Sequence, residues 1–426
     1  MSINTGTETH GRQAEDYRGP LPSAVPATPA LLPATAGATS TPPRRWVRIA
    51  HVWGSSARVA GATATAQAVA GPDPRLLMVF ASFTYDLSEL LAGVAEAAGE
   101  VPVIGCSTAG EIGPGPEPTG GAVIVCLGGD FTVRTACAVG LQERPRGVGE
   151  DLASALLPLP TGEYRVVIML TDALAGDQQE MIRGAYSVLG ATVPLVGGGA
   201  GDDLRMVTSR QFHGGRLLQN AVVAACIGTD SPIGLAIRHG WHRRGDAMVV
   251  TATGGNCLYS LDDRPALDVY LDRHDAPAGV ETDRAAFAEF ALTRPLAVAR
   301  RGDVAVRHVL GADPEARSLI CAGSVPKGAA VWLARGDVAS TLAATEGACA
   351  EAVAGLGGVP LLALLVFDCA GRRALLGDDG IGAERLIMRD RTAGAPVAGF
   401  YTYGEVARTK GVSGFHNQTI VALALS

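Results

Sequence analysis

The sequence has few aromatic residues, few charges and no long hydrophobic run. Aromatic residues make up 5% and charged residues 18% of the 426 positions, whereas hydrophobic residues make up 47%. This balance supplies enough apolar side chains for a large core, so we expect a globular protein in which alanine, valine and leucine fill the interior. No apolar run approaches the ~20 residues that span a bilayer. The N-terminus lacks the basic and apolar regions of a signal peptide, so no membrane partner is expected.

Several kinds of chemistry lack their sequence signatures. The net charge is −7 and the basic residues form no long run, so nucleic acid is not an expected partner. The eight cysteines form no CxxC pair and lie mostly in apolar stretches, which indicates reduced, buried thiols in a cytoplasmic protein. There is no HExxH motif. The segment GGGAGDD, residues 197–203, lacks the lysine and hydroxyl residue of a phosphate-binding P-loop.

The chain divides into a biased tail and a patterned body. Residues 1–44 are rich in proline, alanine and threonine without usable periodicity, so we predict a disordered tail. From WVRIAHVW onward, short apolar runs alternate with helical periodicities, and this predicts a mixed α/β fold. Asp86 and Gly99 are the expected start and stop of one such helix. The segments GGAVIVCLGG and FTVRTACAVG are predicted to form a strand pair.

One order of elements occurs three times in the sequence. It consists of a buried strand, a helix, a strand with proline and glycine three apart, a glycine-rich turn with an acid, and a further strand. The copies contain VPVIGCSTAGEI, VPLVGGGAGDD and APVAGFYTYGEV. The first and third copies align without gaps, matching Pro102, Gly105, Thr108, Gly110 and Glu111 with Pro396, Gly399, Thr402, Gly404 and Glu405. In the middle copy we expect Gly201 and Asp202 to follow a turn one residue shorter. The expected fold is therefore internally repeated strand-helix-strand units that form packed mixed sheets covered by helices.

The turns of the three copies carry most of the candidate ligand-binding residues. Small residues after a strand let backbone N–H groups approach a ligand. If the turns meet around one cleft, the carboxylate of Glu111, Asp202 or Glu405 would bind an amine. The alternative is that each carboxylate accepts hydrogen bonds only from its own turn. The candidate residues are Cys106, Ser107, Thr108, Glu111, Gly198, Gly199, Asp202, Asp203, Asp368, Cys369, Tyr401, Tyr403 and Glu405.

Cysteine and histidine chemistry supplies two alternatives to metabolite binding. Cys106 and Cys369 follow buried strands and would be nucleophiles only if a neighbouring base lowered the pKa of the thiol. His239 and His242 are three apart and would face opposite sides of a strand, so they make a poor metal pair. His213 and His416 each follow a phenylalanine downstream of a turn. We expect no metal and no cofactor. If haem binds, the candidate axial ligands are His213, His239 and His416.

The repeated segments, together with FDCAGRR and GFHNQTIVALAL, resemble the FIST family from about residue 46 to residue 426. The resemblance implies paired domains, which we place at residues 45–260 for the N-terminal domain with two repeats and 261–426 for the C-terminal domain with the third. It also implies a sensory module whose ligands are small molecules such as amino acids. A subset of the family is similar to haem-containing nitric-oxide sensors that regulate histidine kinases.

Three functions follow as hypotheses. The leading one is a cytoplasmic, non-enzymatic sensor that binds an amino-acid-like polar ligand and acts on a separate signalling protein, because the sequence carries no appended kinase, cyclase or methyl-accepting module. The second is a haem-based nitric-oxide sensor that regulates a histidine kinase. The third is an enzyme that uses Cys106 or Cys369.

Overall fold

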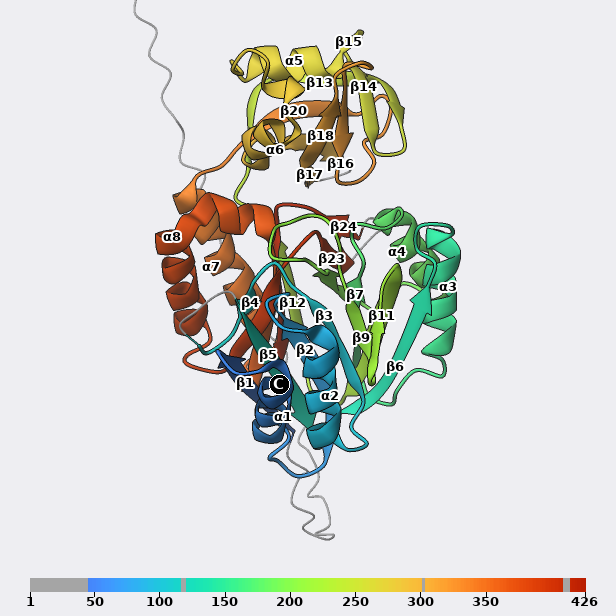
Figure 1. Ribbon diagram of the computed structural model, residues 1–426, viewed down its shortest axis with the longest axis vertical. Coiled ribbons are helices and arrows are strands. Elements are labelled where there is room, and N and C mark those ends of the chain that lie inside the picture. The colour runs from blue at the N-terminus through green and yellow to red at the C-terminus, as the bar shows by residue number, and fades with distance from the viewer. Residues whose placement is uncertain (1–44, 116–119, 301–302, 409–413) are drawn as a thin grey trace, which may run out of the picture. The chain divides into compact units, whose positions relative to one another are not determined.

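The computed structural model describes residues 45–115, 120–300, 303–408 and 414–426, drawn as a ribbon in Figure 1. The predicted tail, residues 1–44, lies outside the described residues. The described chain is mixed α/β, as the sequence predicts, and its helices cover mixed sheets built from three repeats. Within these residues, no helix is both long and apolar enough to cross a membrane.

Each repeat contains a strand, a helix, a strand, a helix, a parallel strand, a turn, one or two short strands and a final strand. The first repeat contains β1 Trp46–Trp53, α1 Ala57–Ala68, β2 Pro74–Ala81, α2 Leu87–Ala98, β3 Val103–Ser107, β4 Glu111–Ile112 and β5 Gly121–Gly128. The second contains β6 Thr132–Val139, α3 Pro145–Ala155, β7 Tyr164–Thr171, α4 Gln178–Leu189, β8 Leu195–Gly199, β9 Gln211–His213, β10 Arg216–Leu218 and β11 Ala221–Thr229. The third contains β12 Ile233–Arg238, α7 Val338–Ala354, β21 Ala363–Cys369, α8 Ala370–Arg391, β22 Val397–Thr402, β23 Glu405–Arg408, β24 Phe415–His416 and β25 Ile420–Leu425.

A separate segment is inserted in the third repeat between β12 and α7. Its strands form a fourth sheet in the order β17-β16-β20-β13-β14-β19-β18, with β15 paired to β14. The elements are β13 His242–Gly254, β14 Cys257–Leu261, β15 Arg264–Pro265, α5 Ala266–Arg273, a 3₁₀ turn Val280–Thr282, α6 Arg284–Leu292, β16 Leu296–Arg300, β17 Asp303–Arg307, β18 Val309–Asp313, β19 Ser318–Cys321 and β20 Ala330–Arg335.

The three repeats exchange their short strands in a closed cycle. The sheet orders are β1-β5-β2-β3-β9-β10, β24-β23-β8-β7-β11-β6 and β12-β25-β21-β22-β4. Thus β9 of the second repeat joins the first sheet, β23 of the third joins the second, and β4 of the first joins the third. Each sheet needs a strand from another repeat to complete its edge, so the three repeats form one interlocked unit.

The inner faces of the three sheets meet in one core. On β2, Leu76, Met78 and Phe80 belong to this shared core, whereas the alternate residues Leu77 and Val79 pack under α1 and α2. This alternation explains why the strands appear in the sequence as continuous apolar runs, because both faces are buried. Phe80 stacks on Phe400 of the third repeat, with ring centroids 4.9 Å apart.

The glycine of the repeated Pro-apolar-apolar-Gly strand is required by a close backbone approach. A Cβ built on Gly105 would lie 2.2 Å from the carbonyl oxygen of Val79, and one on Gly399 would lie 1.7 Å from that of Val366. Any side chain there would force the parallel strands apart. This part of the repeated pattern is therefore a packing requirement.

Two local predictions are wrong. The segments predicted as a strand pair form β5 and β6, but β5 pairs with β1 and β2 in the first sheet while β6 pairs with β11 in the second. Both sides of β5 are already occupied, so β6 begins the next repeat. His239 and His242 do not share a strand, because β12 ends at Arg238 and β13 begins at His242.

Candidate ligand-binding site

The turns that follow β3, β8 and β22 meet, as the convergence hypothesis requires. The backbone N–H of Gly201 donates to Ser107 O at 3.0 Å, and that of Gly199 donates to Gly404 O at 2.7 Å. Tyr401 N donates to Gly110 O at 2.8 Å, which closes the ring between the third and first repeats. The contact is tight enough that a Cβ on Gly201 would lie 2.7 Å from Ala109 N. The turns therefore pack directly against one another at their meeting point.

Glu111 and Glu405 use their carboxylates on their own repeats. Glu111 accepts hydrogen bonds from Thr108 Oγ1 and from Gly121 N at 3.1 Å. Glu405 accepts from Thr402 Oγ1 at 2.6 Å, Thr419 Oγ1 at 2.7 Å and Thr419 N at 3.1 Å. Burial raises the pKa of Glu111 and of Glu405 to about 7, although these hydrogen bonds act in the opposite direction. Each glutamate ties its short strand to the final strand of the same repeat.

Asp202 is not the counterpart of these glutamates. Its carboxylate accepts from the N–H groups of its own loop, from Met206 at 2.8 Å to Thr208 at 2.9 Å, and from the Tyr403 hydroxyl. The predicted alignment is wrong here because the middle turn is longer. Strand pairing shows instead that Gln211, at the start of β9, holds the place that Glu111 holds in β4 and Glu405 holds in β23.

The register makes this correspondence explicit. Gln211 pairs with Cys106, Glu111 with Phe400 and Glu405 with Gly198, and in each case the partner directly follows the motif glycine. Gln211 begins β9 as Glu111 begins β4. The second repeat therefore places a neutral amide where the other two repeats place a carboxylate.

The remaining turn candidates lie in or beside the packed ring. Asp203 is half-buried and accepts from Ser82 Oγ and from Phe83 N at 3.1 Å. Ser107 Oγ accepts from Arg210 N at 2.9 Å. Gly198 and Gly199 lie in β8, against Thr402 and Ala173 respectively, where added Cβ atoms would be within 2.4 Å of those side chains. These contacts account for the small residues without a ligand.

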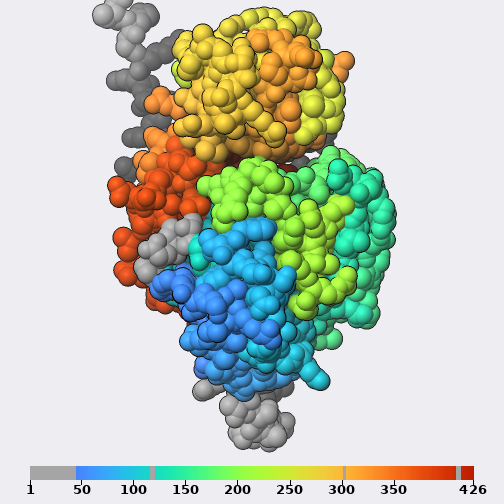
Figure 2. All heavy atoms as spheres, viewed as in Figure 1, coloured from blue at the N-terminus to red at the C-terminus, as the bar shows by residue number. Residues whose placement is uncertain are grey.

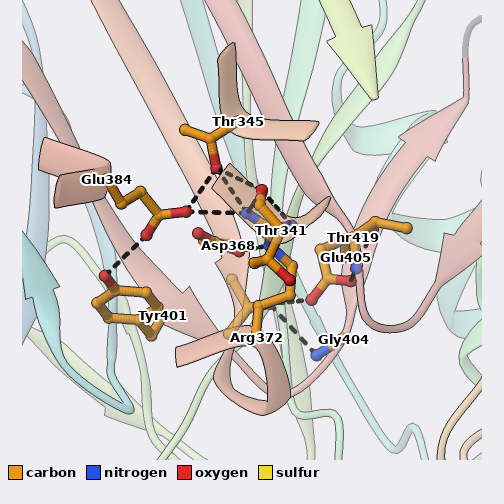
Figure 3. A network of polar contacts seen from close by, with 10 residues as sticks. Thr341, Thr345, Asp368, Arg372, Glu384, Tyr401, Gly404, Glu405 and Thr419 are labelled. Carbon is orange, nitrogen blue, oxygen red and sulfur yellow. Dashed lines mark hydrogen bonds and ion pairs between the residues drawn. The ribbon is translucent and has the colours of Figure 1, made fainter. Parts of the chain in front are cut away.

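Asp368 and Tyr401 belong to a buried ionic network in the third repeat (Figure 3). Arg372 donates to Asp368 Oδ1 at 2.6 Å and to Glu384 Oε1 at 2.8 Å, and all three side chains have no exposed surface. Tyr401 donates to Glu384 at 3.2 Å. Helix α8 is broken at Gly377, so the network ties its two halves together and to β21. Burial raises the pKa of Asp368 well above its usual range, and Asp368 Oδ2 has no hydrogen-bond partner among the described groups.

The two candidate nucleophiles are buried thiols. Burial raises the pKa of Cys106 and of Cys369 well above the usual range, and the nearby carboxylates of Glu111 and Glu405 add to this effect. A thiol in such surroundings stays protonated at neutral pH and is a poor nucleophile. The environment of both residues is that of packed core positions.

One candidate residue, Tyr403, lines a cavity of about 320 Å³. The cavity is also lined by Asp177 and Gln178 of the second repeat and by Asn256 and Ser324 of the inserted segment. Asp177 is the N-cap of α4, and its Oδ1 accepts from Gln179 N at 2.9 Å and from Glu180 N at 3.1 Å. The volume lies at the small end of the range for metabolite sites, about 300–1,000 Å³.

A buried arginine lies behind the wall of this cavity. Arg307 is 2% exposed, and its Nε donates to Ser324 O at 3.4 Å, next to Gly323. Within the described ranges no carboxylate forms an ion pair with Arg307. Burial lowers the pKa of Arg307 to about 10, while the charge of Asp177 raises it, so the guanidinium remains positive at neutral pH. The Asp177 carboxylate therefore lines the cavity on one side, and the positively charged Arg307 lies behind Ser324 in the lining.

Sequence reasoning missed Asp177, Ser324 and Arg307. Asp177 was recognisable as a helix N-cap, because an aspartate precedes the amphipathic segment that forms α4. No sequence feature indicated that Arg307 is buried, because an arginine in a strand is usually exposed and its burial depends on packing between distant segments.

The three candidate haem ligands lie on different elements, His213 in β9, His416 in β24 and His239 between β12 and β13. None of them lines the cavity near Tyr403. His416 Nε2 lies 2.9 Å from Ala407 O, and His239 Nδ1 accepts from Trp241 N at 3.3 Å. His213 Nε2 is buried without a hydrogen-bond partner, but His213 sits in β9 where it pairs with Ile104. His213 and His416 are also not equivalent, because β24 follows the exchanged strand β23 whereas β9 is itself the exchanged strand.

Comparison with known proteins identifies the family. The sequence profile of the FIST N domain matches residues 75–264, and that of the FIST C domain matches residues 266–408. The chain belongs to the FIST family. Members of this family are sensory domains of signal transduction rather than catalytic domains. The FIST C match begins at α5, so it covers the inserted segment from α5 onward and the third repeat from α7 to β23, whereas β12 to β14 belong to the FIST N match. The cavity near Tyr403 is lined by residues of both matched regions.

Two relatives are uncharacterized proteins of Mycobacterium tuberculosis, from strains CDC 1551 / Oshkosh and ATCC 25618 / H37Rv. Each is 28% identical over 231 residues, which cover 53% of this chain. The alignment covers 59% of the length of each relative. The likeness is therefore partial, and it supports common membership of a family rather than a common ligand.

Proposed function

We propose that this FIST protein is a sensor of a small zwitterionic metabolite of the amino-acid class, bound in the cavity near Tyr403. The observation that carries the proposal is the pairing of opposite charges about that cavity. The half-buried Asp177 carboxylate would bind the ammonium group, and the ligand's carboxylate would lie toward Ser324, in front of the Arg307 guanidinium. A buried cation without an acidic partner is costly, and an anionic group of the ligand would offset that cost.

The same proposal includes a cytoplasmic location and a separate signalling partner, such as a histidine kinase. The cavity supports a signalling role because its lining comes from the second repeat, the third repeat and the inserted segment. A ligand that contacts all three would favour one arrangement of them over others, and only such differential contact can shift a conformational equilibrium.

A calorimetric test uses Asp177→Asn and a matched control. Asparagine caps helices about as well as aspartate, so Asp177→Asn keeps the start of α4 while removing the charge. We expect one or more of the common amino acids to stabilise the wild-type protein, by about 2.7 kcal/mol at a concentration of 100 Kd. The Asp177→Asn variant should bind that ligand at least about tenfold more weakly.

Asp86→Asn is the control, because Asp86 caps α2 of the first repeat with the same two hydrogen bonds and does not line the cavity. It should bind like the wild type. The proposal is wrong if no amino acid stabilises the protein, or if the two variants lose affinity equally. An absorbance spectrum of the purified protein tests the haem alternative, which predicts a Soret band.

A further inference from the structure

A second and larger cavity lies where the first and third repeats meet. Its volume is about 910 Å³, and it is lined by β1, by residues 112–114 after the first turn, by α8 and by residues 394–397. Arg385 Nη2 of α8 donates to Gly113 O at 3.0 Å, which joins the two repeats at this place. We call it the arginine groove. Figure 2 shows the first repeat in blue and α8 in red-orange on the same face of the molecule.

The described side chains that line the groove carry charge of one sign. Arg48 lies on β1, and Arg385 and Arg389 lie four positions apart on α8, so the two helical arginines share a face. No aspartate or glutamate is among the described residues that line the groove, although the whole chain has a net charge of −7. Arg389 lies 3.8 Å from Asp390, but both side chains are at least 70% exposed, so this contact leaves the positive charge largely available.

The floor of the groove is apolar. Ile112 and Met388 are nearly fully buried in it, and Val397 and Ile49 are half-buried. Leu386 is 53% exposed on α8 between the two arginines. An exposed leucine at the mouth of an apolar groove is unusual enough to indicate a binding surface, whereas a single leucine on a flat surface is not.

The other two repeats fill the corresponding place with their own chain. In the second repeat β9 continues into β10, which packs against α2 of the first repeat. In the third repeat β24 follows β23 and packs against α4 of the second. In the first repeat β4 has two residues, and no second short strand is present in its connection at residues 113–115 and 120. Residues 112–114, at the start of that connection, line the groove.

We propose that the arginine groove binds an alkyl carboxylate of medium or long chain, with the alkyl chain on the apolar floor and the carboxylate beside Arg48 and Arg389. Guanidinium groups bind carboxylates through two parallel hydrogen bonds, which makes arginine better suited than lysine to this head group. The alkyl chain would cover Leu386 and the floor residues, and apolar burial would supply most of the affinity. The site is separate from the cavity near Tyr403 and does not depend on the function proposed for it.

Isothermal titration of the full chain with decanoate tests the proposal. Decyltrimethylammonium has an alkyl chain of nearly the same length with a cationic head, and acetate has the carboxylate head with only a methyl group. We expect decanoate to bind, decyltrimethylammonium to bind at least about tenfold more weakly, and acetate to give no measurable heat. Arg48→Gln and Arg389→Gln should each weaken decanoate binding about threefold to tenfold. Leu386→Asp, at an exposed position, should weaken it more than either.

Arg75→Gln is the matched control, because Arg75 is an exposed arginine paired with Asp73 away from the groove. It should bind decanoate like the wild type, and so should Asp177→Asn, which separates this site from the other cavity. Equal binding of the anionic and cationic amphiphiles would overturn the proposal, as would unchanged affinity in all three groove variants. Sedimentation with phosphatidylglycerol vesicles in the absence of decanoate binding would also overturn it, in favour of a membrane surface.

Discussion

The first and third repeats place a buried glutamate at the start of the exchanged strand, whereas the second repeat places a glutamine there. Glu111 and Glu405 each accept from the threonine three positions earlier. Glu111 also accepts from Gly121, the first residue of β5, and Glu405 from Thr419, which directly precedes β25. Gln211 instead donates through Nε2 to Ser209 Oγ at 3.0 Å. The same place in the fold therefore carries an acceptor in two repeats and a donor in the third.

The second repeat has moved its carboxylate to another element. Asp172 directly follows β7, and it accepts from Asn220 N at 2.9 Å and from Ser209 Oγ at 2.7 Å. Asn220 immediately precedes the final strand β11, so Asp172 ties down the segment that Glu111 and Glu405 tie down in their repeats. One structural requirement, a buried carboxylate that holds the start of the final strand, is thus met from two different positions. These acids are fixed by the architecture, which weakens the idea that they bind a ligand.

The largest expected effect concerns the Arg372 network, a feature that the described residues show in the third repeat and not in the other two. Arg372→Leu should lower the free energy of unfolding by about 3–5 kcal/mol, because it leaves Asp368 and Glu384 buried without their cation. Urea denaturation measures this loss. Arg183→Leu, which removes a half-exposed ion pair with Glu180 on α4, is the control and should cost less than about 1 kcal/mol. Equal losses in the two variants would show that the third repeat does not depend on its network.

Much of this arrangement could be predicted from the sequence. The motif glycines, the Thr-x-Gly-Glu turns of the first and third copies and the helix cap at Asp86 are local patterns, and the structure confirms them. The exchange of short strands was not predictable, because strand partners depend on register and packing between distant segments. Gln211 was missed because Asp202 lies nearer to the glycines and resembles Glu111. Gly197 and Gln211 are 14 positions apart, against 6 between Gly105 and Glu111.

The second prediction concerns the pH dependence of stability that the buried Glu405 causes. The folded-state pKa of Glu405 is about 7, above its usual value of 4.5, so the folded protein binds more protons than the unfolded chain between these values. The contribution of Glu405 to the free energy of unfolding should therefore fall as pH rises from about 4.5 to about 7 and stay level above. The loss is on the order of 3 kcal/mol for one such group. Glu405→Gln should remove that part of the slope, as chemical denaturation at several pH values would show.

The comparison with wild type is essential because buried histidines act in the opposite direction. Burial lowers the pKa of His51, His274 and His308 to about 4, so their contribution to stability rises with pH between about 4 and 6.5. These groups are common to both proteins, and their effect cancels in the difference. A difference between wild type and Glu405→Gln that does not change with pH would mean that Glu405 is ionised throughout this range.

The smallest effect is expected when Gln211 of the second repeat is replaced by glutamate, the residue that the first and third repeats have at this place. Gln211→Glu should cost about 2 kcal/mol near neutral pH, because a buried acceptor would face Ser209 Oγ, which already donates to Asp172. Adding Asp172→Asn should recover part of this cost, since the hydroxyl proton of Ser209 would then be free for the new carboxylate. A double-mutant cycle measures the coupling, which should favour the double variant by about 1 kcal/mol. Additive effects would mean that Asp172 and Gln211 act independently, and the view that the second repeat has relocated its carboxylate would then fail.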